Sequence, residues 1–445
     1  MTFSPHNLLP EYPARLLVAG NRIMQTEATH ILSDLIQPTA APSWKAARQL
    51  GYPAALWRLP NRTDKHLIVQ LDTALTQMPV DLEELPAGFV MSLFDNFDFG
   101  TGDPFCAPFL RADIHAMQMG SGWEVTENTT SELSESFWAA VRQWNPETAQ
   151  PIAQIIENPT AEATNIVARQ RFEDSVQEAV SAIQQGAFRK VVLSRTKTIV
   201  FDGELDAVAL FEQLCVAYPT AFVSAVWLPG QQQTWVSATP ERLVSTDAVG
   251  MFQTVSLAGT QSAYDADGRL KRTAEALWSQ KEIEEQAIVS RYIIECFKKI
   301  RLREYLEEGP KTVLAGNLMH LGSQFTVDTQ AVRYPQLGTV MTRLLHPTSA
   351  VCGMPRADAF AFINQHEGYD REFYSGFLGP VNIAPGRADD GPESHLFVHI
   401  RCMKIEANTA TLYAGAGLTE DSDPQKEWQE TEMKCQTLLA VIKSL

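Results

Sequence analysis

Strand-like runs joined by short turns constrain the fold of this chain more than any other feature. The stretch AFVSAVWLPGQQQTWVSATPE (221–241) reads as two strands connected by a Pro-Gly turn. Two further strand-like runs, at 394–405 and 409–417, come just before a C-terminal helical pattern. Hairpins and helices are mixed without a regular strand–helix–strand alternation. This order favours an α+β fold with large antiparallel sheets over a doubly wound parallel sheet.

The charge balance of the 445-residue chain restricts the ligands that it can bind. Hydrophobic residues make up 45% of the chain and charged residues 20%, so a large packed core is expected. The formal net charge of −17 argues against nucleic acid as a partner, because phosphate binding needs a basic surface. A site for an anionic small molecule must therefore be a local island of lysine, arginine or a bound cation.

The sequence also indicates the cellular compartment in which the protein is expected. No secretory signal is visible in the first residues, MTFSPHNLLPEY, and no stretch is long and apolar enough to span a membrane. The six cysteines form no CxxC pair, as is typical of buried free thiols in a reducing compartment. We therefore expect a cytoplasmic protein with no membrane partner.

A long amphipathic helix is predicted over residues 268–306, with two glutamates on its apolar face. By helical spacing, Glu282 and Glu285 project on the same side as Trp278 and Tyr292. Burying two carboxylates is costly unless a cation pairs with them. The spacing therefore predicts that this helix face meets a positive charge.

The C-terminal helix repeats this pattern. Asp423 is predicted as its N-cap, and Glu427 and Glu430 again lie three residues apart at the edge of an apolar stripe. Two helices that each offer a glutamate pair indicate a shared divalent cation, and Mg²⁺ suits one or two carboxylates. The alternative is that Glu430 and Lys434 form an ordinary surface pair four residues apart, and the spacing does not choose between them.

The segment FRKVVLSR (188–195) reads as a strand in which Lys190 is out of place. Alternation puts Lys190 on the same face as Phe188, Val192 and Ser194, so it is the only charge on that face. The pattern favours an amine directed into a site, whereas the alternative is a lysine that reaches solvent past the core edge.

Three other positions are candidates with ordinary alternatives. Glu241 directly follows a proline at a strand end, where a carboxylate is either solvated or catalytic. Arg401 alternates with apolar residues in SHLFVHIRCMKI, which reads as one strand. Gly415, near the end of the next strand, leaves a bare backbone that an anion can approach, although most such glycines are only turns.

A series of motifs in the last 270 or so residues resembles the chorismate-utilising enzymes, and among them the isochorismate synthases. The motifs appear in the family's order: KVVLSR (190–195), SATPERL (237–243), SLAGT (256–260), KEIEEQ (281–286), NLMHLGS (317–323), LHPTSAVCGMP (345–355), EGYDREFYSGFLG (367–379), HIRCMKI (399–405) and GAGLTEDSDPQKEWQETEMK (415–434). The resemblance implies one α+β domain over 1–445, with two large antiparallel sheets stacked face to face and flanked by helices. Residues 166–445 would carry the active site, and 1–165 would be a variable N-terminal part of the same fold.

The resemblance also implies chorismate as substrate and Mg²⁺ as the only cofactor. Lys190 matches the general base that activates water for attack at ring carbon C2, and Glu241 matches the acid that protonates the departing C4 hydroxyl. Glu285 and Glu430 match the direct Mg²⁺ ligands, whereas Glu282 and Glu427 match outer carboxylates that hold its waters. The positions that match substrate contacts are Gly259, Thr260, His320, Ala350, Val351, Tyr374, Arg401, Gly415 and Lys434. A monomer is expected.

Two departures and several alternatives accompany this resemblance. The family often has histidine where this chain has Gln286, and leucine where it has Val351, and neither change removes a group needed for the chemistry. The PSPYM-type segment of the ammonia-using members is absent. Salicylate synthases, which share the lysine and the glutamate but go on to eliminate pyruvate, are the alternative. The residues of the motifs PTSAVCG and SATPERL are more similar to those of siderophore-pathway members, which make 2,3-dihydroxybenzoate precursors, than to those of menaquinone-pathway members.

A protein that binds chorismate without catalysis is a further alternative from another functional class. Loss of Lys190, Glu241 or a metal-binding glutamate would indicate such a protein, but all of these residues are present. A purely structural role would leave the inward-facing glutamate pairs unexplained. The sequence therefore favours an enzyme.

Overall fold

The computed structural model describes residues 40–97, 105–120, 122–129, 132–145, 153–156, 161–265, 267–315, 318–386 and 391–445. The side chains of 161–164 and 315 are not among the described atoms. Residues 1–39 of the expected N-terminal part, and Asn317 of the NLMHLGS motif, lie outside the described residues.

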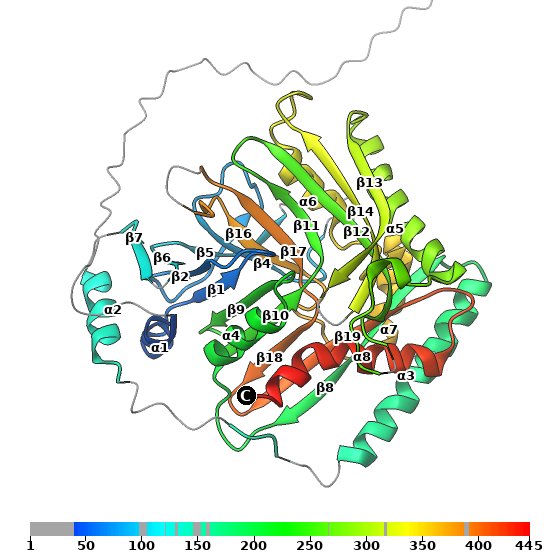
Figure 1. Ribbon diagram of the computed structural model, residues 1–445, viewed down its shortest axis with the longest axis horizontal. Coiled ribbons are helices and arrows are strands. Elements are labelled where there is room, and N and C mark those ends of the chain that lie inside the picture. The colour runs from blue at the N-terminus through cyan, green and yellow to red at the C-terminus, as the bar shows by residue number, and fades with distance from the viewer. Residues whose placement is uncertain are drawn as a thin grey trace, which may run out of the picture.

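Two large antiparallel sheets form the centre of the molecule (Figure 1). The ten-stranded sheet has the order β15 (Gly353–Met354), β8 (Lys190–Val200), β19 (Thr409–Leu418), β18 (Cys402–Glu406), β10 (Gln233–Thr239), β9 (Phe222–Leu228), β1 (Ala54–Arg58), β2 (Lys65–Val69), β6 (Ile114–Met119) and β7 (Gly122–Glu127). The nine-stranded sheet has the order β13 (Leu306–Ala315), β14 (Leu318–Asp328), β12 (Met251–Ser262), β11 (Arg242–Thr246), β17 (Ser394–Val398), β16 (Phe377–Val381), β4 (Gly88–Ser92), β5 (Cys106–Arg111) and β3 (Thr76–Pro79). Strands from residues 54–127 thus contribute to both sheets, and the α+β prediction is confirmed.

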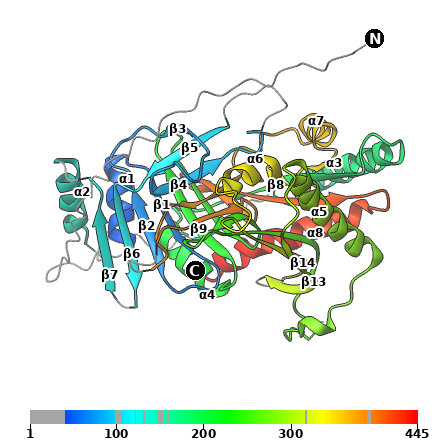
Figure 2. The same ribbon diagram turned by 90° about the horizontal axis from the view of Figure 1, so that it is seen from above.

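Helices cover the outer faces of both sheets. Those on or beside the ten-stranded sheet are α1 (Ala40–Leu50), α2 (Glu132–Gln143), α3 (Ala161–Gln184), α4 (Ala207–Ala217), α7 (Arg356–His366) and α8 (Pro424–Ile442). Those on the nine-stranded sheet are α5 (Gln280–Lys299) and α6 (Leu337–Leu345). In Figure 2, α1 and α2 lie together at one end of the molecule, and α3, α5 and α7 lie towards the other. No helix in the described ranges has the length and apolar character needed to cross a bilayer.

Aromatic side chains fill the space between the sheets. Phe222 of one sheet stacks on Phe397 of the other, with ring centroids 4.1 Å apart. Trp57 and Trp235 are fully buried in the same layer. These large rings hold the two sheets face to face, because each buries a wide apolar area.

Two of the places where the chain crosses between the sheets are adjacent and form a corner. β10 leads into β11 through Pro240 and Glu241, and β17 leads into β18 through His399–Arg401. The crossings lie side by side because β10 pairs with β18 and β11 pairs with β17. The backbone N–H of Val398 donates to the Glu241 carbonyl at 2.9 Å and ties the two crossings together. Both candidate residues, Glu241 and Arg401, therefore sit where the sheets meet.

Two predicted elements were wrong. SHLFVHIRCMKI is not one strand, because the backbone turns at Arg401, which adopts a positive φ of 48°, and continues in the other sheet. The helix predicted over 268–306 runs only from Gln280 to Lys299. Ser279 and Glu282 form a capping box that starts it, and the glutamate carboxylate accepts from the Ser279 backbone at 2.7 Å.

The other elements near the site are confirmed. α3 ends before Gly186, which adopts a positive φ of 82° as expected of a glycine beyond a helix end. Asp423 caps α8 by accepting from the Lys426 backbone N–H at 2.9 Å. All six cysteines are free thiols.

Candidate active site

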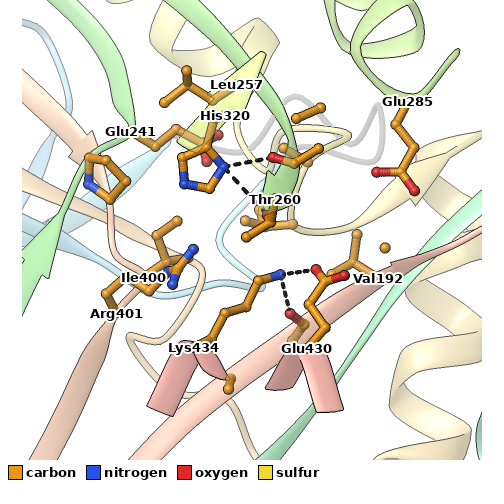
Figure 3. A pocket seen from close by; sticks show the side chains of 18 of the residues that line it. Val192, Glu241, Leu257, Thr260, Glu285, His320, Ile400, Arg401, Glu430 and Lys434 are labelled. Carbon is orange, nitrogen blue, oxygen red and sulfur yellow. Dashed lines mark hydrogen bonds and ion pairs between the residues drawn. The ribbon is translucent and has the colours of Figure 1, made fainter. Parts of the chain in front are cut away.

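A pocket at the corner between the sheets collects most of the residues singled out in the sequence (Figure 3). About 750 Å³ of unfilled space lies within it, open solvent at its mouth included. The predicted residues that line it are Lys190, Glu241, Gly259, Thr260, Glu285, His320, Ala350, Val351, Tyr374, Arg401, Gly415, Glu430 and Lys434. They come from both sheets, two helices and several connecting loops.

Lys190 begins β8 and is nearly inaccessible, with 3% of its surface exposed. Alternation separates it from Arg195 and Lys197, which pair with Glu432 of α8 on the other face of the strand. Burial lowers the pKa of Lys190, and although Glu285 opposes this, Lys434 adds to it. A lysine with a lowered pKa is more readily neutral and therefore better able to accept a proton.

Glu241 is buried at the corner and has the opposite shift. Burial raises its pKa to about 7, although Lys190 and Arg401 both act to lower it. A carboxyl group with this pKa retains a proton near neutral pH and can donate it. The pocket thus contains one group suited to accept a proton and one suited to donate a proton.

Arg401 and Lys434 supply positive charge for an anionic ligand. Arg401 is 8% exposed, and its Nη1 has no hydrogen-bond partner among the described residues. Lys434 donates from Nζ to the Gly415 carbonyl at 2.7 Å and pairs with Glu430 at 2.6 Å. The Glu430–Lys434 pair expected on a surface helix does form, but it lies in the pocket wall (Figure 3). These cations form the local positive island that an acidic chain needs.

Glu285 of α5 and Glu430 of α8 face the same pocket from two different helices (Figure 3). Burial raises the pKa of Glu285. Burial would also raise the pKa of Glu430, but Lys434 lowers it overall and keeps the group ionised. Two carboxylates offer only oxygen donors, which fit Mg²⁺, and leave positions for waters and a ligand oxygen. Within the described residues no three His, Cys, Asp or Glu side chains are arranged so that together they could hold a metal ion, so the protein would supply only part of the coordination.

The two predicted outer carboxylates lie outside the pocket lining. Glu282 caps the first turn of α5, where its carboxylate is bound to the Ser279 backbone. Glu427 is almost fully buried behind Glu430 and accepts from Lys281 Nζ at 2.6 Å. Burial and the neighbouring Glu430 raise the pKa of Glu427, and Lys281 acts against both.

His320 is held as a neutral hydrogen-bond acceptor. Burial lowers its pKa to about 3, so the ring carries no charge near neutral pH. Its Nδ1 lies 2.7 Å from the Gly259 carbonyl, which can only accept, so this nitrogen carries the hydrogen. Nε2 is then an acceptor, and it has no partner within the described part of the chain. It is free to accept from a ligand hydroxyl.

Arg371 fixes the loop that carries Ala350 and Val351. Its guanidinium donates to the Val351 carbonyl at 2.8 Å and to the Val192 carbonyl of β8 at 2.7 Å. It is 4% exposed and is also paired with Glu367. The loop is therefore clamped against the strand that carries Lys190.

Several lining residues were not predicted as site residues. They are Val192, Pro240, Leu257, Ala258, Ile400, Tyr413, Ala414 and Gly417. Alternation along β8 and β19 could have indicated Val192, Tyr413 and Gly417, because they share faces with Lys190 and Gly415. Nothing in the sequence marks Ile400, since it enters the pocket only through the crossing between sheets.

Residues 120–443 match the protein family described as chorismate binding enzyme. The chain belongs to the chorismate binding enzyme family. It is therefore an enzyme with chorismate as its small-molecule substrate, and the resemblance seen in the motifs is confirmed.

Curated members of this family are similar over most of this chain. Isochorismate synthase EntC of Escherichia coli (strain K12) is 29% identical over 289 residues, which cover 63% of this chain and 71% of the relative. The vibriobactin-specific isochorismate synthase of Vibrio cholerae is 26% identical over 290 residues, which cover 65% and 69%.

Solved structures of the family share the fold. The menaquinone-specific isochorismate synthase MenF of Escherichia coli superposes with a TM-score of 0.69 and 22% identity, over 92% of each chain. Anthranilate synthase component I of Streptococcus pneumoniae superposes with a TM-score of 0.60 and 18% identity, over 96% of this chain and all of the other. The two stacked sheets are thus common to members of the family.

Proposed function

We propose that this chain is an isochorismate synthase, an isomerase that converts chorismate to isochorismate with Mg²⁺. Neutral Lys190 takes a proton from water as the water oxygen bonds to ring carbon C2. The ring double bonds shift, the C4–O bond breaks, and Glu241 gives its proton to the departing hydroxyl, which leaves as water. One water enters and one leaves, so substrate and product are isomers.

The observation that carries the proposal is the opposite pKa shift of two buried groups in one pocket. Burial lowers the pKa of Lys190 and raises that of Glu241 to about 7. General acid–base catalysis needs such a pair, because each group must be in the protonation state opposite to its usual one. The relatives named as isochorismate synthases, one of them vibriobactin-specific and one menaquinone-specific, support the same reaction.

The charges of the pocket support binding of an anionic substrate. Arg401 offers an unpaired guanidinium N–H, and Lys434 offers a second cation on the same side of the pocket. Glu285 and Glu430 are proposed to bind Mg²⁺ directly. Glu282 and Glu427 would lie farther from the cation, as outer carboxylates. Once bound, the cation would offset the negative charge of a substrate carboxylate. His320 and the backbone at Gly259 and Thr260 would then line the ring.

The departure at Gln286 is compatible with this proposal. The residue is 3% exposed, and its amide donates to the hydroxyls of Ser256, Ser290 and Ser323 at 3.0–3.1 Å. It does not line the pocket. The side chain beside Glu285 is therefore part of a buried serine cluster, not a group that meets the ring.

Product analysis tests the proposal. The purified protein is incubated with chorismate, with and without Mg²⁺, and the products are separated by chromatography and identified by mass. Isochorismate formed only with Mg²⁺ is the expected result. Salicylate and pyruvate formed by the enzyme, or no turnover of chorismate, would contradict the proposal. A monomeric state and a cytoplasmic location stay predictions.

Gly417 offers a graded test of how Lys190 is positioned. A methyl group on Gly417 would lie 3.2 Å from Lys190 Cε and 3.5 Å from Nζ. We expect Gly417→Ala to shift the amine by a few tenths of an ångström. The expected fall in kcat is about 10-fold, less than the roughly 10²-fold cost of a 1 Å misplacement. Gly122→Ala, in a strand where the added methyl meets only one atom at 3.9 Å, is the control. Equal kcat values for the two variants would argue against a base at Lys190.

A further inference from the structure

Lys281 contributes a positive charge behind the carboxylates of the pocket. It lies in the first turn of α5, one turn before Glu285. Its Nζ is 2.6 Å from Glu427 Oε1 and 3.7 Å from Glu285 Oε1. It therefore connects the two helices that carry the glutamates, α5 and α8.

Two of the three carboxylates around this point are largely buried. The side chain of Glu427 is 2% exposed and that of Glu285 is 12% exposed. Glu430, the third, is paired with Lys434 at 2.6 Å. Lys281 and Lys434 are the two cations paired with these carboxylates, and Arg401 acts on Glu430 as well. Such balance is needed because an unpaired buried carboxylate is strongly destabilising.

Lys281 differs from the other lysines of the site in its position. Lys190 and Lys434 line the pocket, whereas Lys281 does not and so has no access to a substrate in it. Its amine pairs with Glu427 and Glu285. A charge placed there acts on whatever cation the carboxylates hold, but not on the reacting ring.

We propose that Lys281 is a built-in counter-ion that sets the affinity of this site for a divalent cation. This inference rests on the proposed function, because it takes Glu285 and Glu430 as the metal-binding residues. In the metal-free protein, the positive charge of Lys281 balances Glu427 and Glu285 and lowers the free-energy cost of burying these carboxylates. The same charge repels an incoming cation, so metal binding is weaker than two carboxylates alone would give.

The proposal links two measurements that a simple structural defect would not link. Lys281→Met removes the charge but keeps an apolar stem of similar length. We expect the metal-free variant to melt at a lower temperature than the wild type. We also expect its dissociation constant for Mg²⁺ to fall about tenfold, because like charges a few ångströms apart repel even when partly screened. A folding defect alone would weaken both stability and metal binding.

The test is calorimetric titration of the metal-free full chain with Mg²⁺, without chorismate, together with thermal melts. Lys281→Arg should bind Mg²⁺ as the wild type does, because the charge is kept. Lys298→Met removes the same charge from an exposed position in the last turn of the same helix and should change neither quantity. Lys281→Gln, which keeps a polar contact with Glu427, serves if the methionine variant does not fold, and it too should bind more tightly.

The outcomes separate this inference from the proposed function. Unchanged or weaker Mg²⁺ binding by folded Lys281→Met or Lys281→Gln would overturn the role of Lys281 and leave the function standing. A wild-type protein that binds no Mg²⁺ would overturn both this inference and the metal requirement. The inference is confirmed if Lys281→Met or Lys281→Gln binds Mg²⁺ more tightly than the wild type and Lys281→Arg does not.

Discussion

Lys190→Met is expected to reduce kcat with chorismate by about 10²–10⁴-fold, the usual contribution of a general base. Methionine keeps an unbranched side chain of similar length and places no charge in the buried position. The variant should therefore fold and still bind chorismate, because Arg401 and Lys434 remain. Steady-state kinetics and calorimetric titration with chorismate separate the two effects.

Lys197→Met is the matched control for this variant. Lys197 lies on the same strand but faces α8, where it pairs with Glu432 at 2.8 Å. We expect this variant to lose some stability and to keep its turnover. Full activity in Lys190→Met would rule out the assignment of the base, whereas loss of chorismate binding would indicate a role in binding instead.

Glu241→Gln is expected to lower kcat strongly and, at the same time, to stabilise the protein at alkaline pH. Glutamine cannot donate a proton to the departing hydroxyl, so kcat should fall by about 10²–10⁴-fold. The second effect follows from burial, which raises the pKa of Glu241 from 4.5 to about 7. Ionisation of this group is therefore more costly in the folded than in the unfolded chain.

The sign of the pH dependence is fixed by this shift. Below pH 4.5 the carboxyl is protonated in both states and carries no penalty. Between pH 4.5 and about 7 the unfolded chain loses its proton first, so wild-type stability falls as pH rises. One pKa unit corresponds to about 1.4 kcal/mol, so the full penalty above pH 7 is about 3 kcal/mol. Glu241→Gln should recover this amount at alkaline pH and little of it near pH 4.

Denaturant unfolding near pH 4 and at alkaline pH, without chorismate or Mg²⁺, measures the difference in free energy of unfolding between Glu241→Gln and the wild type. Glu432→Gln provides a control of opposite sign. Burial would raise the pKa of Glu432, but Lys197 and Arg195 lower it overall. Its substitution should therefore destabilise the protein most at alkaline pH. A Glu241→Gln variant that is no more stable than the wild type at alkaline pH would contradict the raised pKa.

The parts of the site that the sequence predicted are those set by local periodicity. Strand alternation isolated Lys190 as the only charge on its face, and the structure buries it. Helical spacing selected the pairs Glu282–Glu285 and Glu427–Glu430, and only the second glutamate of each pair lines the pocket. The family resemblance, not the spacing, distinguished these two. The capping box at Ser279 was also readable, and it would have corrected the overlong helix.

The parts that periodicity missed depend on the path of the chain between sheets. SHLFVHIRCMKI alternates like one strand, so nothing in its pattern marks the turn at Arg401. That turn exists because β17 and β18 pair with strands of different sheets. Glu241 reaches the pocket through the neighbouring crossing from β10 to β11. Ile400 reaches it through the crossing from β17 to β18 that also carries Arg401. The positions of these residues depend on pairing between strands that are distant in the sequence. Alternation within one segment does not predict such pairing.

Isotope labelling tests the central claim, that water adds at C2 while the C4 hydroxyl leaves. The wild-type enzyme is incubated with chorismate and Mg²⁺ in water enriched in ¹⁸O, and isochorismate is collected early in the reaction. The account predicts one ¹⁸O atom per molecule of isochorismate, located in the hydroxyl at C2. Isochorismate without ¹⁸O would show that the hydroxyl migrates within the substrate, and would contradict the roles of Lys190 and Glu241.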